Sequence, residues 1–160
     1  MTTVNPATTA KPAPAASPVL SPTGTYLIRG ASLLGAERAD LLIRDGVIAA
    51  VGQELEAPEG SLVIEAEGLI ALPGMVDLHT HLREPGREDA ETVETGTRAA
   101  ALGGFTAVHA MANSNPVADT AGVVEQVYSL GLKSGWVDVR PVGAVTVGLK
   151  GERLAELGAM

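Results

Sequence analysis

The strands and helices that alternate after Pro73-Gly74 are the feature that most limits how this chain can fold. Short apolar segments at 75–78, 105–111 and 137–142 predict strands, and the segments 90–102 and 120–130 between them predict helices. A third helix is expected to begin at 152–157. Strands and helices alternating at this spacing are typical of βαβ units around a parallel sheet, so the predicted fold class is α/β.

Local signals set the expected ends of the helices. Asp89 is the expected N-cap of the first helix, because its side chain can accept a hydrogen bond from the first turn, and Gly103-Gly104 is the expected stop. Gly131 is the expected residue just past the end of the second helix.

Before Pro73 the sequence predicts strands only, at 26–29, 41–44, 47–51, 62–65 and 69–72. Asp45-Gly46 separates two of them and predicts a hairpin, because a type I′ turn needs positive φ angles. Residues 25–72 are therefore expected to form a small antiparallel β unit. Residues 1–24 hold five of the ten prolines and one charge, a composition that predicts a disordered tail.

Composition excludes several classes of protein. The 160 residues carry 19 acidic and 11 basic side chains, and this net charge of -8 argues against a nucleic-acid or anionic-membrane surface. The absence of cysteine excludes a disulfide scaffold and a thiolate zinc site. No apolar run reaches the roughly 20 residues of a membrane span, and prolines interrupt any secretory signal. A cytoplasmic location is expected.

The sharpest motif is His79-Thr80-His81, directly after the predicted strand 75–78. In an extended backbone, residues i and i+2 project to the same side about 6.6 Å apart, so both imidazoles can converge on one cation with bonds of about 2.0 to 2.1 Å. The carboxyl ends of parallel strands are also where catalytic groups sit. Spacing alone leaves open the alternative of two exposed histidines without a ligand role.

Arg83 follows two residues later, and its planar guanidinium suits a substrate carboxylate held by paired hydrogen bonds. The alternative is a surface arginine paired with Glu84 or Glu88. Either interpretation fits the sequence around this position.

Three further polar residues lie on or next to the predicted strands. Asn113 can donate and accept hydrogen bonds with a polar ligand, or it can serve only in a turn before Pro116. His109 could be a ligand, but we expect a hydrogen-bonded histidine among apolar neighbours. Asp77 is a candidate for orienting the histidine strand.

Together these motifs resemble the opening segment of the dihydroorotase family of cyclic amidohydrolases. The most specific string is His79-Thr80-His81-Leu82-Arg83-Glu84-Pro85-Gly86, and the resemblance continues to Leu157 through 91–97, 103–106, 111–113 and 143–146. The fold implied is an amidohydrolase (β/α) barrel preceded by a small β-sandwich-like unit. Residues 73–160 would then be the first β/α units of a barrel that is incomplete in this chain, since a closed eight-stranded barrel typically needs about 250 residues.

The resemblance also implies residue roles. His79 and His81 would be ligands of one Zn²⁺ in a site usually described as binuclear, and Arg83 with Asn113 would grip the substrate carboxylate. The implied reaction is the reversible cyclisation of N-carbamoyl-L-aspartate to (S)-dihydroorotate and water in de novo pyrimidine (UMP) biosynthesis.

The family's other ligands and its catalytic aspartate would lie beyond Met160, so no catalytic residue is assigned here and we expect an inactive N-terminal fragment. The implied partners are this small-molecule substrate, and either aspartate transcarbamoylase or further copies of the chain. Two alternatives stay open: another cyclic amidohydrolase of the allantoinase or hydantoinase type, and a non-catalytic scaffold for aspartate transcarbamoylase.

Overall fold

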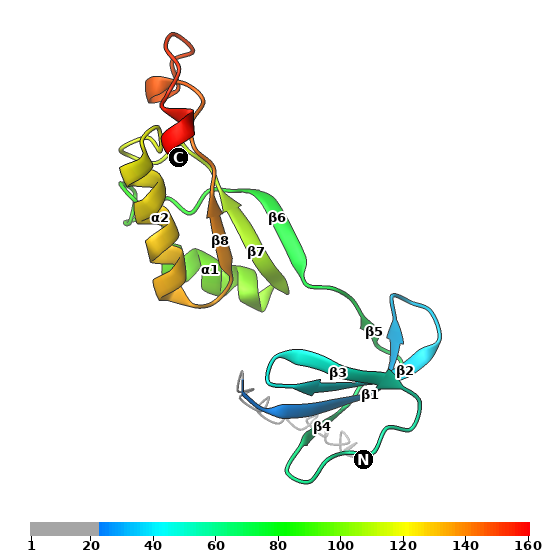
Figure 1. Cartoon of the computed structure of the whole chain (residues 1–160). Helices are drawn as coiled ribbons and strands as arrows, with labels where there is room; N and C mark the ends of the chain where they lie inside the picture. Colours follow the sequence, from blue (N-terminus) through cyan, green and yellow to red (C-terminus); the bar gives the residue numbers. More distant parts are fainter. Residues whose placement is uncertain (1–22) are drawn as a thin grey trace, which may run out of the picture. The chain divides into compact units, whose positions relative to one another are not determined.

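The computed structural model describes residues 23–160 (Figure 1). The chain divides into two compact units, Met1–Leu72 and Pro73–Met160, and each is described by itself. Apart from its last two residues, the predicted tail 1–24 lies outside the described residues. In the part described, neither helix has the length and apolar character needed to cross a membrane.

The first unit is one mixed sheet with the strand order β3-β2-β1-β4, in which β5 also pairs with β1. Its strands are β1 (Thr25–Leu33), β2 (Arg38–Arg44), β3 (Val47–Gly52), β4 (Leu62–Glu65) and β5 (Ile70–Ala71). The predicted antiparallel pairing holds for β1, β2 and β3. It is wrong for β4 and β5, which run parallel to β1 because the connection 53–61 carries the chain from one edge of the sheet to the other.

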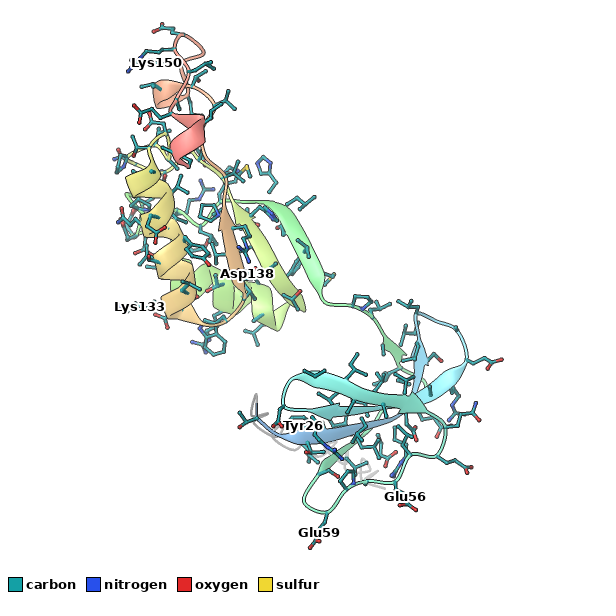
Figure 2. All side chains as sticks on the ribbon, in the orientation of Figure 1. Tyr26, Glu56, Glu59, Lys133, Asp138 and Lys150 are labelled. Atoms are coloured by element: carbon teal, nitrogen blue, oxygen red, sulfur yellow. The ribbon has the colours of Figure 1, made fainter. Side chains whose placement is uncertain are left out.

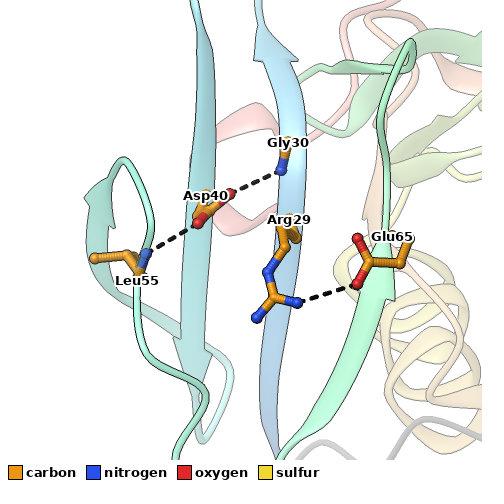
Figure 3. A network of polar contacts seen from close by, with 5 residues as sticks. All are labelled: Arg29, Gly30, Asp40, Leu55 and Glu65. Carbon is orange, nitrogen blue, oxygen red and sulfur yellow. Dashed lines mark hydrogen bonds and ion pairs between the residues drawn. The ribbon is translucent and has the colours of Figure 1, made fainter.

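The hairpin predicted at Asp45-Gly46 is confirmed, since these residues have φ angles of 49° and 77° between the antiparallel strands β2 and β3. Asp40, which sequence analysis did not select, is buried in this unit, and its carboxylate connects three of its segments by hydrogen bonds (Figure 3). It accepts hydrogen bonds from the backbone N–H groups of Gly30 at 2.8 Å and Leu55 at 3.0 Å. Asp40 thereby joins a bulge in β1 and the connection after β3 to β2.

The second unit contains the parallel sheet that the sequence predicts, with the order β6-β7-β8. Its elements are β6 (Met75–Thr80), α1 (Val93–Leu102), β7 (Phe105–Ala110), α2 (Ala121–Ser134) and β8 (Asp138–Pro141). The helices pack against each other and against one face of the sheet (Figure 1). The core between the layers consists of Leu82, Val93, Val108, Ala110, Val127 and Val139.

The first helix begins at Val93, three residues later than predicted, and its N-cap is Thr92 in place of Asp89. The Thr92 hydroxyl accepts a hydrogen bond from the Thr95 backbone at 3.2 Å, and the Thr95 hydroxyl accepts one from the Thr92 backbone at 3.0 Å. Residues 87–90 instead form a turn, closed by the bond from the Ala90 N–H to the Arg87 carbonyl. The predicted stop at Gly103 is confirmed.

The second helix runs through Gly131 to Ser134, so the predicted end at Gly131 is wrong. The left-handed residue that ends this helix is Gly135, with a φ of 67°. Gly131 is needed for packing, because a Cβ atom there would lie 2.5 Å from the Cβ of Val139 on β8.

The helix predicted at 152–157 is also wrong. This segment pairs back onto the loop after β8: the Val147 N–H donates to the Arg153 carbonyl, and the Ala155 N–H donates to the Val145 carbonyl, both at 2.9 Å. The carbonyl of Arg153 and the N–H of Ala155 are therefore hydrogen-bonded to that loop and not within a helix. A short 3-10 turn, Leu157–Ala159, follows.

Candidate functional site

The carboxyl ends of the three parallel strands surround an open hollow of about 440 Å³. His79 at the end of β6 and His81 directly after it border the hollow, as do Met111 to Asn113 on the loop after β7 and Val142 to Thr146 with Leu149 on the loop after β8. Sequence analysis assigned no site role to this last loop. Its position directly after the predicted strand 137–142 is the signal that could have revealed it. Lys133 in the last turn of α2 and Asp138 at the start of β8 lie at the other end of the sheet, away from this hollow (Figure 2).

His79 and His81 turn their Nε2 atoms toward each other, at a separation of 3.2 Å. The ring centroids are 5.0 Å apart, and the planes meet at 69°. Two nitrogen ligands of a tetrahedral zinc, each bonded at about 2.0 to 2.1 Å, would lie about 3.3 Å apart. The donor type and the spacing of this pair therefore fit a zinc ion.

Asp77 fixes the backbone of the first histidine. Its Oδ1 accepts a hydrogen bond from the His79 backbone N–H at 2.9 Å, which agrees with the orienting role considered for Asp77. This hydrogen bond is the main cause that holds the pKa of the Asp77 carboxyl below its usual value. The carboxylate thus remains charged, and a good acceptor, through the neutral range.

Asn113, on the loop after β7, contacts the second histidine. Its Oδ1 lies 2.8 Å from Nδ1 of His81. Asn113 also lines a smaller hollow of about 130 Å³ together with Arg83. The structure therefore joins His79, His81 and Asn113 by direct contacts, and Arg83 shares a second hollow with Asn113.

Arg83 is exposed on the loop after β6, and its backbone is left-handed with a φ of 65°. The carboxylates of Glu84 and Glu88, which were considered as its partners, bind backbone N–H groups instead. Glu84 accepts a hydrogen bond from the Val93 N–H at 2.7 Å, and Glu88 accepts one from the Gly86 N–H at 2.9 Å. This second bond lowers the pKa of Glu88. Within residues 23–160, neither carboxylate forms an ion pair with Arg83.

The loop with Arg83 and the loop with Asn113 are joined by their backbones. The Asn115 N–H donates to the Pro85 carbonyl at 2.9 Å. Gly86 has a φ of 101°, and a Cβ atom there would lie 2.3 Å from the Asn115 carbonyl oxygen. Only glycine permits this close approach, which fixes the spacing between the two loops.

His109 does not behave as expected. Its Nδ1 is buried and has no hydrogen-bond partner among the described residues, so the prediction of a hydrogen-bonded histidine is wrong for this atom. It also does not extend the histidine pair, since residues 23–160 contain no cluster of three or more side chains from histidine, cysteine, aspartate and glutamate that could hold a metal.

Comparison with solved structures defines the class of protein. L-hydantoinase from Arthrobacter aurescens is similar with a TM-score of 0.65 and 25% identity, over 76% of this chain and 28% of that one. D-hydantoinase from Thermus sp. is similar with a TM-score of 0.55 and 29% identity, again over 76% of this chain and 28% of that one. The fold is the N-terminal part of an amidohydrolase barrel.

Sequence comparison narrows the class to one family. Residues 68–160 match the family described as dihydro-orotase-like, and the chain belongs to that family. It is 69% identical over 134 residues to a dihydroorotase from Streptomyces coelicolor, and 59% identical over 137 residues to one from Mycobacterium tuberculosis. These matches cover 84% and 85% of this chain but only 31% and 32% of the relatives. The chain thus spans about a third of the length of the curated relatives it matches.

Proposed function

We propose that the protein is a zinc-dependent dihydroorotase that interconverts N-carbamoyl-L-aspartate and (S)-dihydroorotate plus water in pyrimidine biosynthesis. The family match and the dihydroorotases at 59% and 69% identity support the substrate class. The observation that carries the proposal is the convergence of the His79 and His81 Nε2 atoms, 3.2 Å apart, with Asn113 in contact with His81 and lining a hollow together with Arg83.

In this proposal His79 and His81 hold one zinc through Nε2. When bound, zinc supplies a Lewis acid that polarises a carbonyl and lowers the pKa of water to about 7. The chain's own contribution is to orient the two imidazoles, by the Asp77 bond to the backbone of His79 and the Asn113 contact with His81.

Arg83 and Asn113 are the proposed substrate-binding pair. Both line the smaller hollow, and Arg83 keeps its guanidinium out of ion pairs with the neighbouring carboxylates. A guanidinium and an amide N–H group there would bind the carboxylate that the two compounds share. Their role is to hold the substrate in one orientation and to neutralise its charge, and no bond is made or broken on them.

The remaining parts of the proposal concern the whole protein. They are a second zinc, a cytoplasmic location, and association with aspartate transcarbamoylase or with further copies of the chain. None of them is needed for the arrangement of His79, His81, Arg83 and Asn113.

The proposal is tested by turnover of dihydroorotate and by zinc content, measured both for residues 1–160 and for a protein of the relatives' full length that begins with this chain. We expect the longer protein to hydrolyse dihydroorotate and the 160-residue chain to be inactive. Hydantoin and dihydrouracil are the control substrates, because neither carries a ring carboxylate. Faster turnover of these neutral rings would favour a hydantoinase-type enzyme, and a metal-free, inactive longer protein would favour a scaffold.

A further inference from the structure

We infer that Asn113 is a positioning residue for the metal site: its amide oxygen fixes the tautomer and the orientation of the His81 ring. This inference deepens the proposed function and rests on it for the identity of the metal. It assigns to Asn113 a role beyond substrate binding.

The side chain of Asn113 contacts the ring of His81 directly. Asn113 Oδ1 lies 2.8 Å from His81 Nδ1, and an amide oxygen can only accept a hydrogen bond. With this oxygen facing the ring, the contact is a hydrogen bond when His81 carries its proton on Nδ1, and we infer that tautomer. In a neutral imidazole with a proton on Nδ1, Nε2 has a free lone pair.

The lone pair on His81 Nε2 points toward His79. His81 Nε2 is the atom that faces His79 Nε2 at 3.2 Å, so the protonated nitrogen points to Asn113 and the unprotonated one points to the place between the rings. A histidine that binds a metal usually donates its other ring N–H to an oxygen, which sets the tautomer and makes the ligand more basic.

Backbone hydrogen bonds hold the loop that carries Asn113 in place. The Ala118 N–H donates to the Ala112 carbonyl at 3.0 Å, and the Met111 N–H donates to the Thr80 carbonyl at 2.9 Å. The bond from Asn115 to Pro85 fixes the other side of Asn113. Asn113 is thus held between residues that are tied to β6 and to the loop after it.

The oxygen and the NH₂ group of the Asn113 amide have separate roles. The oxygen of Asn113 is used by His81, so only its NH₂ group remains to donate to a substrate carboxylate. Replacement of Asn113 by aspartate keeps the acceptor and removes the donor, whereas replacement by alanine removes both.

The test is the tautomer of His81 in the metal-free 160-residue chain, measured from imidazole ¹⁵N chemical shifts, followed by titration with ZnCl₂. In the unaltered chain and in Asn113→Asp we expect the proton of neutral His81 on Nδ1. In Asn113→Ala we expect a shift toward the Nε2-protonated form and zinc affinity about 10- to 100-fold lower. Asn115→Ala is the matched control, since it removes an exposed amide from the same loop, and should leave the tautomer unchanged.

An unchanged tautomer in Asn113→Ala, or a tautomer in Asn113→Asp that resembles that of Asn113→Ala, would overturn the inference whatever the zinc titration gives. Neither readout uses a substrate. A protein that fails to turn over dihydroorotate would therefore refute the proposed function and leave this inference standing.

Discussion

Arg83 and Arg87 lie four residues apart after β6 and line the same hollow, but their surroundings differ. Arg87 Nε lies 3.8 Å from Asp89 Oδ1, whereas Glu84 and Glu88 are both bound to backbone N–H groups. In the described part of the chain, Arg83 is thus the arginine of this hollow without a carboxylate partner.

We therefore predict that Arg83→Ala raises the KM for dihydroorotate about 10- to 100-fold in the full-length protein, because a charged hydrogen bond is worth about 1.5 to 3 kcal/mol. Arg83→Lys should recover only part of this loss, since an ammonium group lacks the planar pair of donors. Steady-state kinetics with Arg87→Ala as the matched control checks the prediction. A large KM effect in Arg87→Ala and none in Arg83→Ala would show that Arg87, and not Arg83, binds the substrate.

At the scale of elements, the strands were predictable and the helix ends only partly so. Short apolar segments and the Pro73-Gly74 and Gly103-Gly104 signals place β6, the end of α1 and β7 within one or two residues of the structure. The start of α1 was predicted three residues too early, although the Thr92–Thr95 pair that caps it is local in the sequence. The bond from the Val93 N–H to Glu84, in a loop nine residues earlier, is the part of this helix start that the local pattern does not contain. Gly131 has the local signature of a helix end, yet the contact with Val139 that requires glycine there comes from the next strand.

This contrast predicts opposite effects for two glycines of α2. Gly131→Ala should destabilise the chain by about 1 to 3 kcal/mol, because the new Cβ atom would overlap Val139. Gly122→Ala should stabilise it by about 0.5 to 1 kcal/mol, because its Cβ position has no neighbour within 4 Å and alanine is the better helix former. Urea unfolding followed by circular dichroism measures both. A similar loss of stability in both variants would show that contact with Val139 is not the cause.

At the scale of the whole molecule, the sequence predicted which strand ends carry the site but not how its residues meet. The spacing of His79 and His81 places both imidazoles on one side of the chain. The contact between His81 and Asn113 requires β7 to lie beside β6 in parallel, with Thr80 opposite Ala110. That pairing is a property of the sheet order, which the chain's local pattern does not contain.

Both units expose large apolar side chains. Val47, Ile48 and Val51 are exposed on β3, an edge strand of the first sheet, and Val76 and Leu78 are exposed on β6, an edge strand of the second. Apolar patches next to open strand edges promote association between chains. We therefore expect the 160-residue chain to bind hydrophobic dyes and to self-associate.

Neighbouring apolar residues on β6 and β7 differ sharply in their exposure. Leu78 is 70% exposed and Val108, on the neighbouring strand β7, is 1% exposed. In the 160-residue chain, Leu78→Lys should change the free energy of unfolding by no more than about 0.5 kcal/mol and reduce self-association, whereas Val108→Lys should cost more than about 3 kcal/mol by burying an unpaired charge. In a protein of the relatives' full length, the interior of a closed barrel is filled with side chains, so Leu78→Lys should there cost more than about 2 kcal/mol. Urea unfolding of both lengths, with sedimentation velocity for association, makes the comparison. Equal tolerance of Leu78→Lys at both lengths would mean that this face of β6 stays open to solvent when the rest of the fold is present.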